Sequence, residues 1–171
     1  MSNFVYILMG VSGSGKTTIA KELLKKHDIP YIDGDYLHPK SNILKMSSGQ
    51  PLDDKDREPW LGLINNAVFA MQKTNPSSII ICSSLKKKYR NMIRDSNDNL
   101  IFLFLEADFE CIYKRLKART GHFQKPQMLI SQFEALEIPS EDENDVYFID
   151  ANQNIDDIVN SIKNICLERS S

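Results

Sequence analysis

Residues 10–17 read Gly-Val-Ser-Gly-Ser-Gly-Lys-Thr, which matches the spacing of a phosphate-binding P-loop. The octapeptide follows an apolar run, Phe4–Met9, and precedes a segment in which Ile19, Leu23 and Leu24 have helical spacing. In a strand-loop-helix order, the backbone N–H groups of the loop and the N-terminus of the helix can point at the same anion. The octapeptide therefore predicts an α/β domain that binds a nucleotide.

Two side chains of this loop have a defined chemistry. Lys16 is expected to reach the β- and γ-phosphates of ATP, and the Thr17 hydroxyl is expected to bind Mg²⁺. The residues expected to bind the nucleotide are Gly10, Ser12, Gly13, Ser14, Gly15, Lys16, Thr17 and Thr18. A flexible glycine-rich turn is the alternative explanation, and the strand and helix on either side argue against it.

The rest of the chain alternates between short apolar runs and segments of helical periodicity. The predicted strands are Phe4–Met9, Ser78–Cys82, Leu100–Leu105 and Val146–Ile149, with Pro30–Ile32 as a weaker candidate. Runs that are apolar on both faces are typical of a parallel sheet covered by helices. Because there is no internal repeat or interdomain linker, residues 1–171 are predicted to form one α/β domain.

Three helices are predicted from their apolar spacing. Asp108 is expected to cap a helix that turns Ile112 and Leu116 inward. The other two stripes are Trp60, Leu63, Ile64, Ala67, Val68 and Met71, and Ile155, Ile158, Val159, Ile162 and Ile165.

Composition and charge narrow the class of protein. The chain has 42% hydrophobic and 26% charged residues and a net charge of −2, which is ordinary for a globular domain and unlike a general nucleic-acid binder. No segment has the length of a membrane span. Cys82, Cys111 and Cys166 are far apart and odd in number, so neither a disulfide framework nor a metal site is indicated. A cytoplasmic enzyme is the expectation.

Two carboxylates follow the second predicted strand. If that strand continues, Asp33 and Asp35 project from the same face, at the carboxyl edge of the sheet beside the P-loop. We expect Asp33 to lie nearer the metal, and Asp35 to face an acceptor hydroxyl and take its proton. A solvated turn is the alternative for an isolated Asp-Gly-Asp sequence.

Basic residues near the predicted site have competing explanations. Arg57 could hold a substrate carboxylate or pair with one of the nearby aspartates, Asp53, Asp54 and Asp56. The run from Lys86 to Arg90 could be a solvated helix face with one or two members turned into the site. Arg119 is expected to stabilise the transferring phosphate, with Arg115 as the competing candidate.

The histidines and the segment before the last strand are less constrained. His27 is expected at the surface, whereas His38 and His122 could hydrogen-bond a polyol or have no role. Residues 120–143 combine a short amphipathic helix with an acidic run, which fits a flap over an active site or an ordinary surface excursion.

Three strings of sequence carry a resemblance to the gluconate kinase family, related to the shikimate and nucleoside monophosphate kinases. They are DGDYLHPKSNILKMSSGQPLDDKDREPWL (33–61), CSSLKKKYRNMIR (82–94) and LKARTGHFQKPQMLISQFEALEIP (116–139). The resemblance implies a three-layer α/β/α fold on a parallel five-stranded sheet, a lid at about 120–137, and often a homodimer.

The same resemblance implies a reaction. The acceptor would be D-gluconate, phosphorylated by ATP on its 6-hydroxyl to give 6-phosphogluconate and ADP. Arg57, Lys86 or Arg90 would neutralise the gluconate carboxylate, while Asp35 and His38 would contact hydroxyls. His122 is a further candidate for the acceptor site.

Three other functions compete with gluconate phosphorylation. A kinase for shikimate or a nucleoside would be the most similar enzyme, and the 33–61 string argues against it. A nucleotide-dependent switch is the second, but the region after Ile149 lacks an Asn-Lys-x-Asp guanine motif. A catalytically dead binding subunit conflicts with the intact Lys16, Thr17, Asp33 and Asp35.

Overall fold

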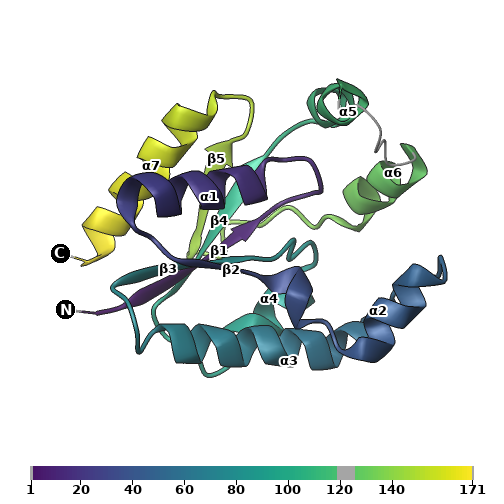
Figure 1. Cartoon of the computed structure of the whole chain (residues 1–171), viewed down its shortest axis with the longest axis horizontal. Helices are drawn as coiled ribbons and strands as arrows, with labels where there is room; N and C mark the ends of the chain where they lie inside the picture. The colour runs from purple at the N-terminus through teal and green to yellow at the C-terminus, as the bar shows by residue number, and fades with distance from the viewer. Residues whose placement is uncertain (1, 119–125, 171) are drawn as a thin grey trace.

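The computed structural model describes residues 2–118 and 126–170. Its centre is one parallel five-stranded sheet with the strand order β2-β3-β1-β4-β5 (Figure 1). The strands are β1 (Phe4–Met9), β2 (Tyr31–Asp33), β3 (Ser77–Ile81), β4 (Leu100–Glu106) and β5 (Val146–Asp150). Every strand predicted from the sequence is present, including the weaker candidate, which became β2.

Helices cover both faces of this sheet. Figure 1 shows α1 and α7 on one face and α3 and α4 on the other, with α5 and α6 beyond the end of the sheet where β1 leads into α1. The helices are α1 (Lys16–His27), the 3-10 helix η1 (Gly34–Leu37), α2 (Lys40–Ser47), α3 (Asp54–Met71), α4 (Lys87–Arg94), α5 (Phe109–Ala118), α6 (Pro126–Ala135) and α7 (Ile155–Ser170). The predicted three-layer α/β/α fold is confirmed.

The alternation of side chains along β1 explains the two-sided cover. Tyr6 and Leu8 pack into the core under α1 and α7, whereas Val5, Ile7 and Met9 pack into the core under α3 and α4. All five are fully buried. Burial of a large apolar side chain is worth about 1.5–3 kcal/mol, so β1 stabilises both layers at once.

The predicted helices are present, but Leu24 of α1 and Ile130 of α6, both expected on apolar faces, are 44% and 43% exposed. Asp108 accepts a hydrogen bond from the Cys111 N–H at 2.8 Å and caps α5, which buries Ile112 and Leu116 as predicted. In α3 the prediction was wrong for Leu63, which is 43% exposed; Leu61 is buried in its place.

The parallel register aligns the ends of three strands. Leu8 pairs with Ile81, and Ile81 pairs with Asp33, so β1, β3 and β2 end at nearly the same level. The Gly10 N–H donates to the Ser83 carbonyl at 3.2 Å just beyond the strands. The P-loop, the Asp33 turn and the segment after β3 therefore meet at one edge of the sheet, the edge where parallel α/β proteins bind ligands.

A buried ion pair fastens the segment after β3 to the segment before β5. Arg90 is fully buried and donates to both carboxylate oxygens of Glu143, at 2.7 and 2.8 Å. Its remaining N–H groups reach the carbonyls of Ser84 (2.9 Å), Leu85 (3.3 Å) and Glu137 (3.0 Å). All five N–H donors of the guanidinium are therefore used within the protein.

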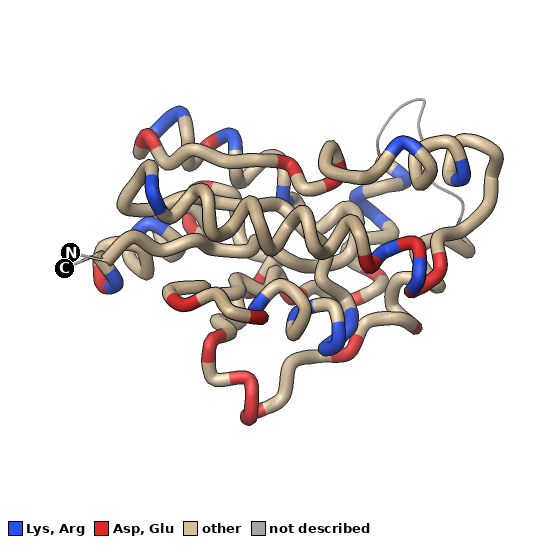
Figure 2. The backbone as a smooth tube through the Cα atoms, turned by 90° about the horizontal axis from the view of Figure 1, so that it is seen from below, with Lys and Arg blue, Asp and Glu red and all other residues tan. Residues whose placement is uncertain are grey.

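The charged residues are mixed along the chain. Lys and Arg alternate with Asp and Glu over the backbone tube, in keeping with the net charge of −2 (Figure 2). Within residues 2–118 and 126–170, no helix combines the length and the apolar character that crossing a membrane requires.

We predict that Glu143→Ala destabilises the fold sharply. The substitution leaves the Arg90 charge buried without its carboxylate, a change that typically costs about 3–5 kcal/mol. Urea unfolding monitored by circular dichroism measures the loss. Glu141→Ala, an exposed position on the same loop, is the matched control and should change little. Equal unfolding midpoints for the two variants would contradict the structural role of the pair.

Candidate active site

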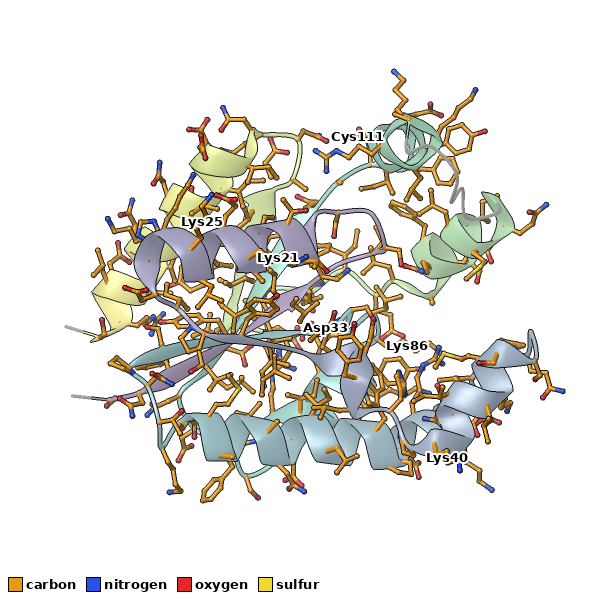
Figure 3. All side chains as sticks on the ribbon, viewed as in Figure 1. Lys21, Lys25, Asp33, Lys40, Lys86 and Cys111 are labelled. Atoms are coloured by element: carbon orange, nitrogen blue, oxygen red, sulfur yellow. The ribbon has the colours of Figure 1, made fainter. Side chains whose placement is uncertain are left out.

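A cavity of about 430 Å³ opens at the carboxyl edge of the sheet. It contains both halves of the predicted site, since the P-loop and the two aspartates share it. The lining residues are Ser12, Gly13, Gly15, Lys16, Thr17, Thr18, Asp33, Asp35, Ile81 and Leu116. Figure 3 shows Asp33 and Lys86 at this end of the sheet, between the P-loop and α2.

The P-loop has the backbone that its glycines permit. Gly13 has φ +83°, and a Cβ atom there would lie 3.1 Å from side-chain atoms of Ile112 and Leu116 on α5. Glycine is therefore needed at this position both for the left-handed backbone and for the close approach to α5. The Ser14 hydroxyl donates to the Val11 carbonyl at 2.8 Å and closes the loop from within.

Lys16 lies over the loop that it belongs to. Its ammonium donates to the carbonyls of Gly10 (2.6 Å) and Val11 (2.9 Å). Burial of the ammonium lowers the pKa of Lys16 to about 8, and the nearby charges of Asp35 and Asp33 oppose this shift. A pKa of about 8 leaves the ammonium form predominant at neutral pH, and bound phosphates would favour this charged form further.

The two aspartates come together in a way that differs from the sequence prediction. The strand does not continue: β2 ends at Asp33 and η1 begins at Gly34. Asp33 instead caps η1, accepting a hydrogen bond from the Asp35 N–H at 3.0 Å. Both carboxylates still line the cavity. Burial raises the pKa of Asp35, the charge of Asp33 raises it further, and the charge of Lys16 opposes both.

Gly34 holds this pair of carboxylates against the sheet. A Cβ atom at Gly34 would lie 2.4 Å from the Ile81 carbonyl oxygen, so no other residue fits without moving the backbone. The Trp60 indole N–H donates to the Gly34 carbonyl at 2.8 Å. Helix α3 thus fixes the peptide between the two aspartates.

His38 follows η1 and is held on two sides. Its ring stacks on Trp60 with the centroids 4.1 Å apart, and its Nδ1 lies 3.2 Å from the Asn42 amide nitrogen. Because an amide N–H can only donate, Nδ1 is the acceptor in the neutral ring and the proton is on Nε2. Burial lowers the pKa of His38, as does the nearby charge of Arg57. The lowered pKa favours the neutral ring, which can donate from Nε2.

Arg57 does not form an ion pair with Asp53, Asp54 or Asp56. Its Nη1 donates to the Leu52 carbonyl at 2.9 Å and to the Tyr89 hydroxyl at 3.3 Å. Among the residues that the structure describes, its Nε and Nη2 have no hydrogen-bond partner and no carboxylate pairs with it. These N–H groups remain available to an acidic ligand.

The basic run after β3 divides into three roles. Lys86 lies 3.6 Å from Asp54 and is partly exposed, and Lys88 pairs with the same carboxylate. Lys87 pairs with Asp142, away from the aspartate turn. Arg90, predicted to bind the substrate, is placed elsewhere: it is buried, and its five donors are used by protein atoms. That prediction is corrected, because no donor of Arg90 is left for a ligand.

Some predicted residues lie outside the described part of the chain or away from the cavity. Arg119 and His122 fall within residues 119–125, which are not described, as does the start of the predicted lid. The competing candidate Arg115 donates to the Ala151 carbonyl, on the loop after β5. From the second half of the predicted lid, α6 packs against α5 through Leu129 and Phe133.

The residues present fit a magnesium ion that arrives with ATP. Thr17 and Asp33 line the same cavity, so a hydroxyl and a carboxylate face the space where the phosphates would lie. Within the described ranges, no three His, Cys, Asp or Glu side chains form a cage that could hold a metal by themselves. Mg²⁺ commonly takes only one or two protein ligands and completes its shell with phosphates and water.

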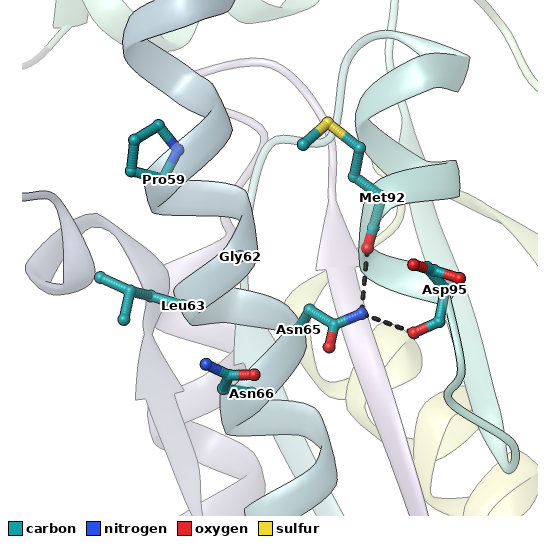
Figure 4. Close-up of a pocket in the computed structure, with 7 residues that line it drawn as sticks. All are labelled: Pro59, Gly62, Leu63, Asn65, Asn66, Met92 and Asp95. Atoms are coloured by element: carbon teal, nitrogen blue, oxygen red, sulfur yellow. Dashed lines mark hydrogen bonds between the residues drawn. The ribbon is translucent and has the colours of Figure 1, made fainter.

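A second hollow, of about 440 Å³, lies between α3 and α4 and has a different character (Figure 4). Asn65 on its wall donates to the carbonyls of Met92 (3.0 Å) and Asp95 (2.8 Å). Asp95 is the residue that directly follows α4. The P-loop and the aspartates do not line it. The phosphate chemistry therefore belongs to the cavity at the sheet edge.

Two residues that support His38 and Arg57 were not predicted. Asn42 is buried and orients His38 while also donating to the Asp56 carbonyl at 2.8 Å. Tyr89 supports Arg57 from α4. Asn42 falls within the 33–61 string, but its type and position alone carried no signal, because a polar residue in a helix is usually solvated.

Comparison with known proteins defines the class of this fold and site. A sequence model of the shikimate kinase family matches residues 12–166. The structure is also similar to that of APS kinase from Mycobacterium tuberculosis, with a TM-score of 0.63 over 98% of both chains at 18% identity, a likeness of fold alone. The chain belongs to the P-loop kinases related to shikimate kinase.

Closer relatives narrow this class. The chain is 53% identical to the thermoresistant gluconokinase of Escherichia coli K12, covering 92% of this chain and 90% of the relative. It is 46% identical to the thermosensitive gluconokinase of the same organism, covering 98% and 89%. The crystal structure of a gluconokinase from Sinorhizobium meliloti 1021 matches with a TM-score of 0.81 at 35% identity, covering 98% and 91%. The chain is a member of the gluconokinase family.

We predict that nucleotide affinity falls as the pH rises through the pKa of Lys16, near pH 8. The ammonium form binds phosphate, so affinity should drop by up to about tenfold per pH unit above that value. Isothermal titration with ADP above pH 8, in buffers of different ionisation enthalpy, should also detect proton uptake on binding. Lys16→Ala is the control and should show no such uptake. A wild-type affinity that is flat across this range would rule out the proposed protonation.

Proposed function

We propose that this protein transfers the γ-phosphoryl group of ATP to the 6-hydroxyl of D-gluconate, giving 6-phosphogluconate and ADP. The observation that carries the proposal is the shared cavity, in which the P-loop lysine and the Asp35 carboxylate, whose pKa is raised, lie close enough to influence each other. The choice of gluconate as the acceptor is supported by the gluconokinases that resemble this chain over nine-tenths of its length. Such a product would feed the pentose phosphate pathway.

The donor half of the reaction rests on the P-loop. Its backbone N–H groups and the N-terminus of α1 would hold the β-phosphate. The Lys16 ammonium has three N–H donors, two of which serve the carbonyls of Gly10 and Val11, and the third would bind the phosphate oxygens. Thr17 and Asp33 would hold Mg²⁺, directly or through water. When bound, Mg²⁺ neutralises charge on the phosphates and aids departure of ADP.

The acceptor half rests on Asp35. The 6-hydroxyl oxygen forms the new bond to the γ-phosphorus, the bond to the bridging oxygen of ADP breaks, and the hydroxyl proton passes to the Asp35 carboxylate. Partial desolvation and the Asp33 charge raise the pKa of Asp35, which makes it a better proton acceptor than an aspartate of ordinary pKa. The Lys16 charge opposes this shift and favours the ionised carboxylate.

The acceptor itself would be held by groups of complementary chemistry. The free N–H groups of Arg57 and the ammonium of Lys86 suit the gluconate carboxylate, and the Nε2–H of His38 suits a hydroxyl. Arg119 and His122 remain our candidates for contacts to the transferring phosphate and to the acceptor. They belong to the segment that the resemblance assigns to a lid, at about 120–137.

We further propose that the protein acts as one domain, in the cytoplasm and as a homodimer. The single sheet supports the proposal of one domain. The presence of ATP in the cytoplasm supports the proposed location. The family resemblance supports the homodimer, which sedimentation of the purified protein would test.

The proposed acceptor is tested by ADP release in the presence of ATP and Mg²⁺. We predict strong stimulation by D-gluconate and little by shikimate, glucose, a nucleoside or no acceptor, because only gluconate combines a carboxylate for Arg57 and Lys86 with a primary hydroxyl for Asp35. A coupled assay for ADP measures the rates. Preferential turnover of another acceptor would refute the gluconate assignment while leaving the P-loop kinase class intact.

We predict that Asp35→Asn separates chemistry from nucleotide binding. Loss of the general base should lower kcat by about 10²- to 10⁴-fold. The affinity for ADP, measured by titration, should change far less, because Asp35 faces the acceptor. Asp157→Asn, an exposed carboxylate at the start of α7, is the matched control and should keep full activity. Normal turnover by a folded Asp35→Asn protein would remove Asp35 from the mechanism.

A further inference from the structure

A glutamine on α6 reaches across the chain to the P-loop. The Ser12 N–H donates to the Gln132 Oε1 at 2.7 Å, and the Gln132 Nε2 donates to the Ser12 hydroxyl at 2.9 Å. A carboxamide is suited to this pair of contacts because it carries an acceptor and a donor side by side. Ser12 itself lines the phosphate cavity.

The Ser12 N–H is one end of a peptide group that has a second task. The other end is the Val11 carbonyl, which accepts hydrogen bonds from the Lys16 ammonium at 2.9 Å and from the Ser14 hydroxyl at 2.8 Å. Because a peptide group is planar and rigid, fixing its N–H also fixes the direction of its carbonyl. Gln132 therefore orients the Val11–Ser12 peptide group, whose carbonyl accepts a hydrogen bond from Lys16.

Helix α6 is well placed to transmit this constraint. Leu129 is buried with Val11 and Leu116, and Phe133 packs edge-on against Phe109 with the ring centroids 5.7 Å apart. Gln132 is a polar side chain within this otherwise apolar contact. The apolar packing holds the helix against the loop, and the amide sets which way the peptide faces.

The far end of α6 is tied to the segment after β3, on the acceptor side. The Glu137 N–H donates to the Leu85 carbonyl at 2.7 Å, and its carboxylate accepts from the Lys87 N–H at 3.1 Å. Arg90 holds the Glu137 carbonyl from within the core. The segment from Gln132 to Glu137 thus spans from the phosphate loop to the acceptor half of the site.

We infer that Gln132 is a positioning residue for phosphoryl transfer: through the Val11–Ser12 peptide it sets the location of Lys16, and so couples α6 to the phosphate loop. This inference rests on the proposed kinase function for its effect on turnover. The effect of Gln132 on Lys16 is independent of the proposed function, because nucleotide binding can be measured without any acceptor.

The test compares Gln132→Ala, Gln132→Glu and the control Gln127→Ala, which removes an exposed glutamine from the same helix. Misplacing a catalytic group costs up to about 10²-fold, so Gln132→Ala should lower kcat about 10- to 100-fold with KM for gluconate nearly unchanged. Gln132→Glu keeps an acceptor for the Ser12 N–H and should recover part of this loss. Gln127→Ala should match the wild type.

A second readout separates positioning from a merely structural role. ADP affinity reports on Lys16: Gln132→Ala should weaken it in the wild-type background and have little further effect in a Lys16→Ala background, because the constraint then has no ammonium to position. Gln127→Ala should leave ADP affinity unchanged in both backgrounds. Circular dichroism confirms that each variant is folded. A folded Gln132→Ala protein with wild-type kcat and wild-type ADP affinity would overturn the inference. An equal loss of ADP affinity in the two backgrounds would also overturn it, because the loss would then not act through Lys16.

Discussion

Hydrogen bonds between the parallel strands β1, β3 and β2 hold Leu8, Ile81 and Asp33 at one level of the sheet. Every group of the site depends on this register. A slip of one residue would turn each buried side chain to the other face and would separate the P-loop from the aspartate turn. Since strands apolar on both faces must be covered on both sides, the register and the three layers stabilise each other.

The aspartate turn shows how closely the site is fitted to this sheet edge. Gly34 has no room for a Cβ atom beside the Ile81 carbonyl. The indole N–H of Trp60, on α3, donates a hydrogen bond to the Gly34 carbonyl. The same indole supports the His38 ring. One buried aromatic residue thus orders both the carboxylate that would take the proton and a ring that would bind the acceptor. Such support from a neighbouring helix is what a reaction that depends on positioning requires.

Local patterns in the sequence predicted much of this arrangement. The P-loop octapeptide and the apolar runs were sufficient for the fold, because the spacing of glycines and of apolar residues reflects backbone geometry directly. They were insufficient for Arg90, whose partner Glu143 is 53 residues away, so that a buried ion pair and a ligand-binding arginine look alike in sequence. Gln132 was missed for the same reason: its partner Ser12 is 120 residues away. The end of β2 was also misjudged, because the cap that Asp33 provides for η1 competes with strand continuation.

In the proposed reaction, one cavity brings the γ-phosphate of ATP to the primary hydroxyl of a sugar acid. Phosphorus NMR of the product formed from ATP, Mg²⁺ and D-gluconate tests it most directly, because coupling to protons shows which carbon carries the phosphate. We predict a phosphomonoester whose signal is split into a triplet by the two protons on C6. A doublet from a secondary carbon, or inorganic phosphate as the only product, would contradict the account.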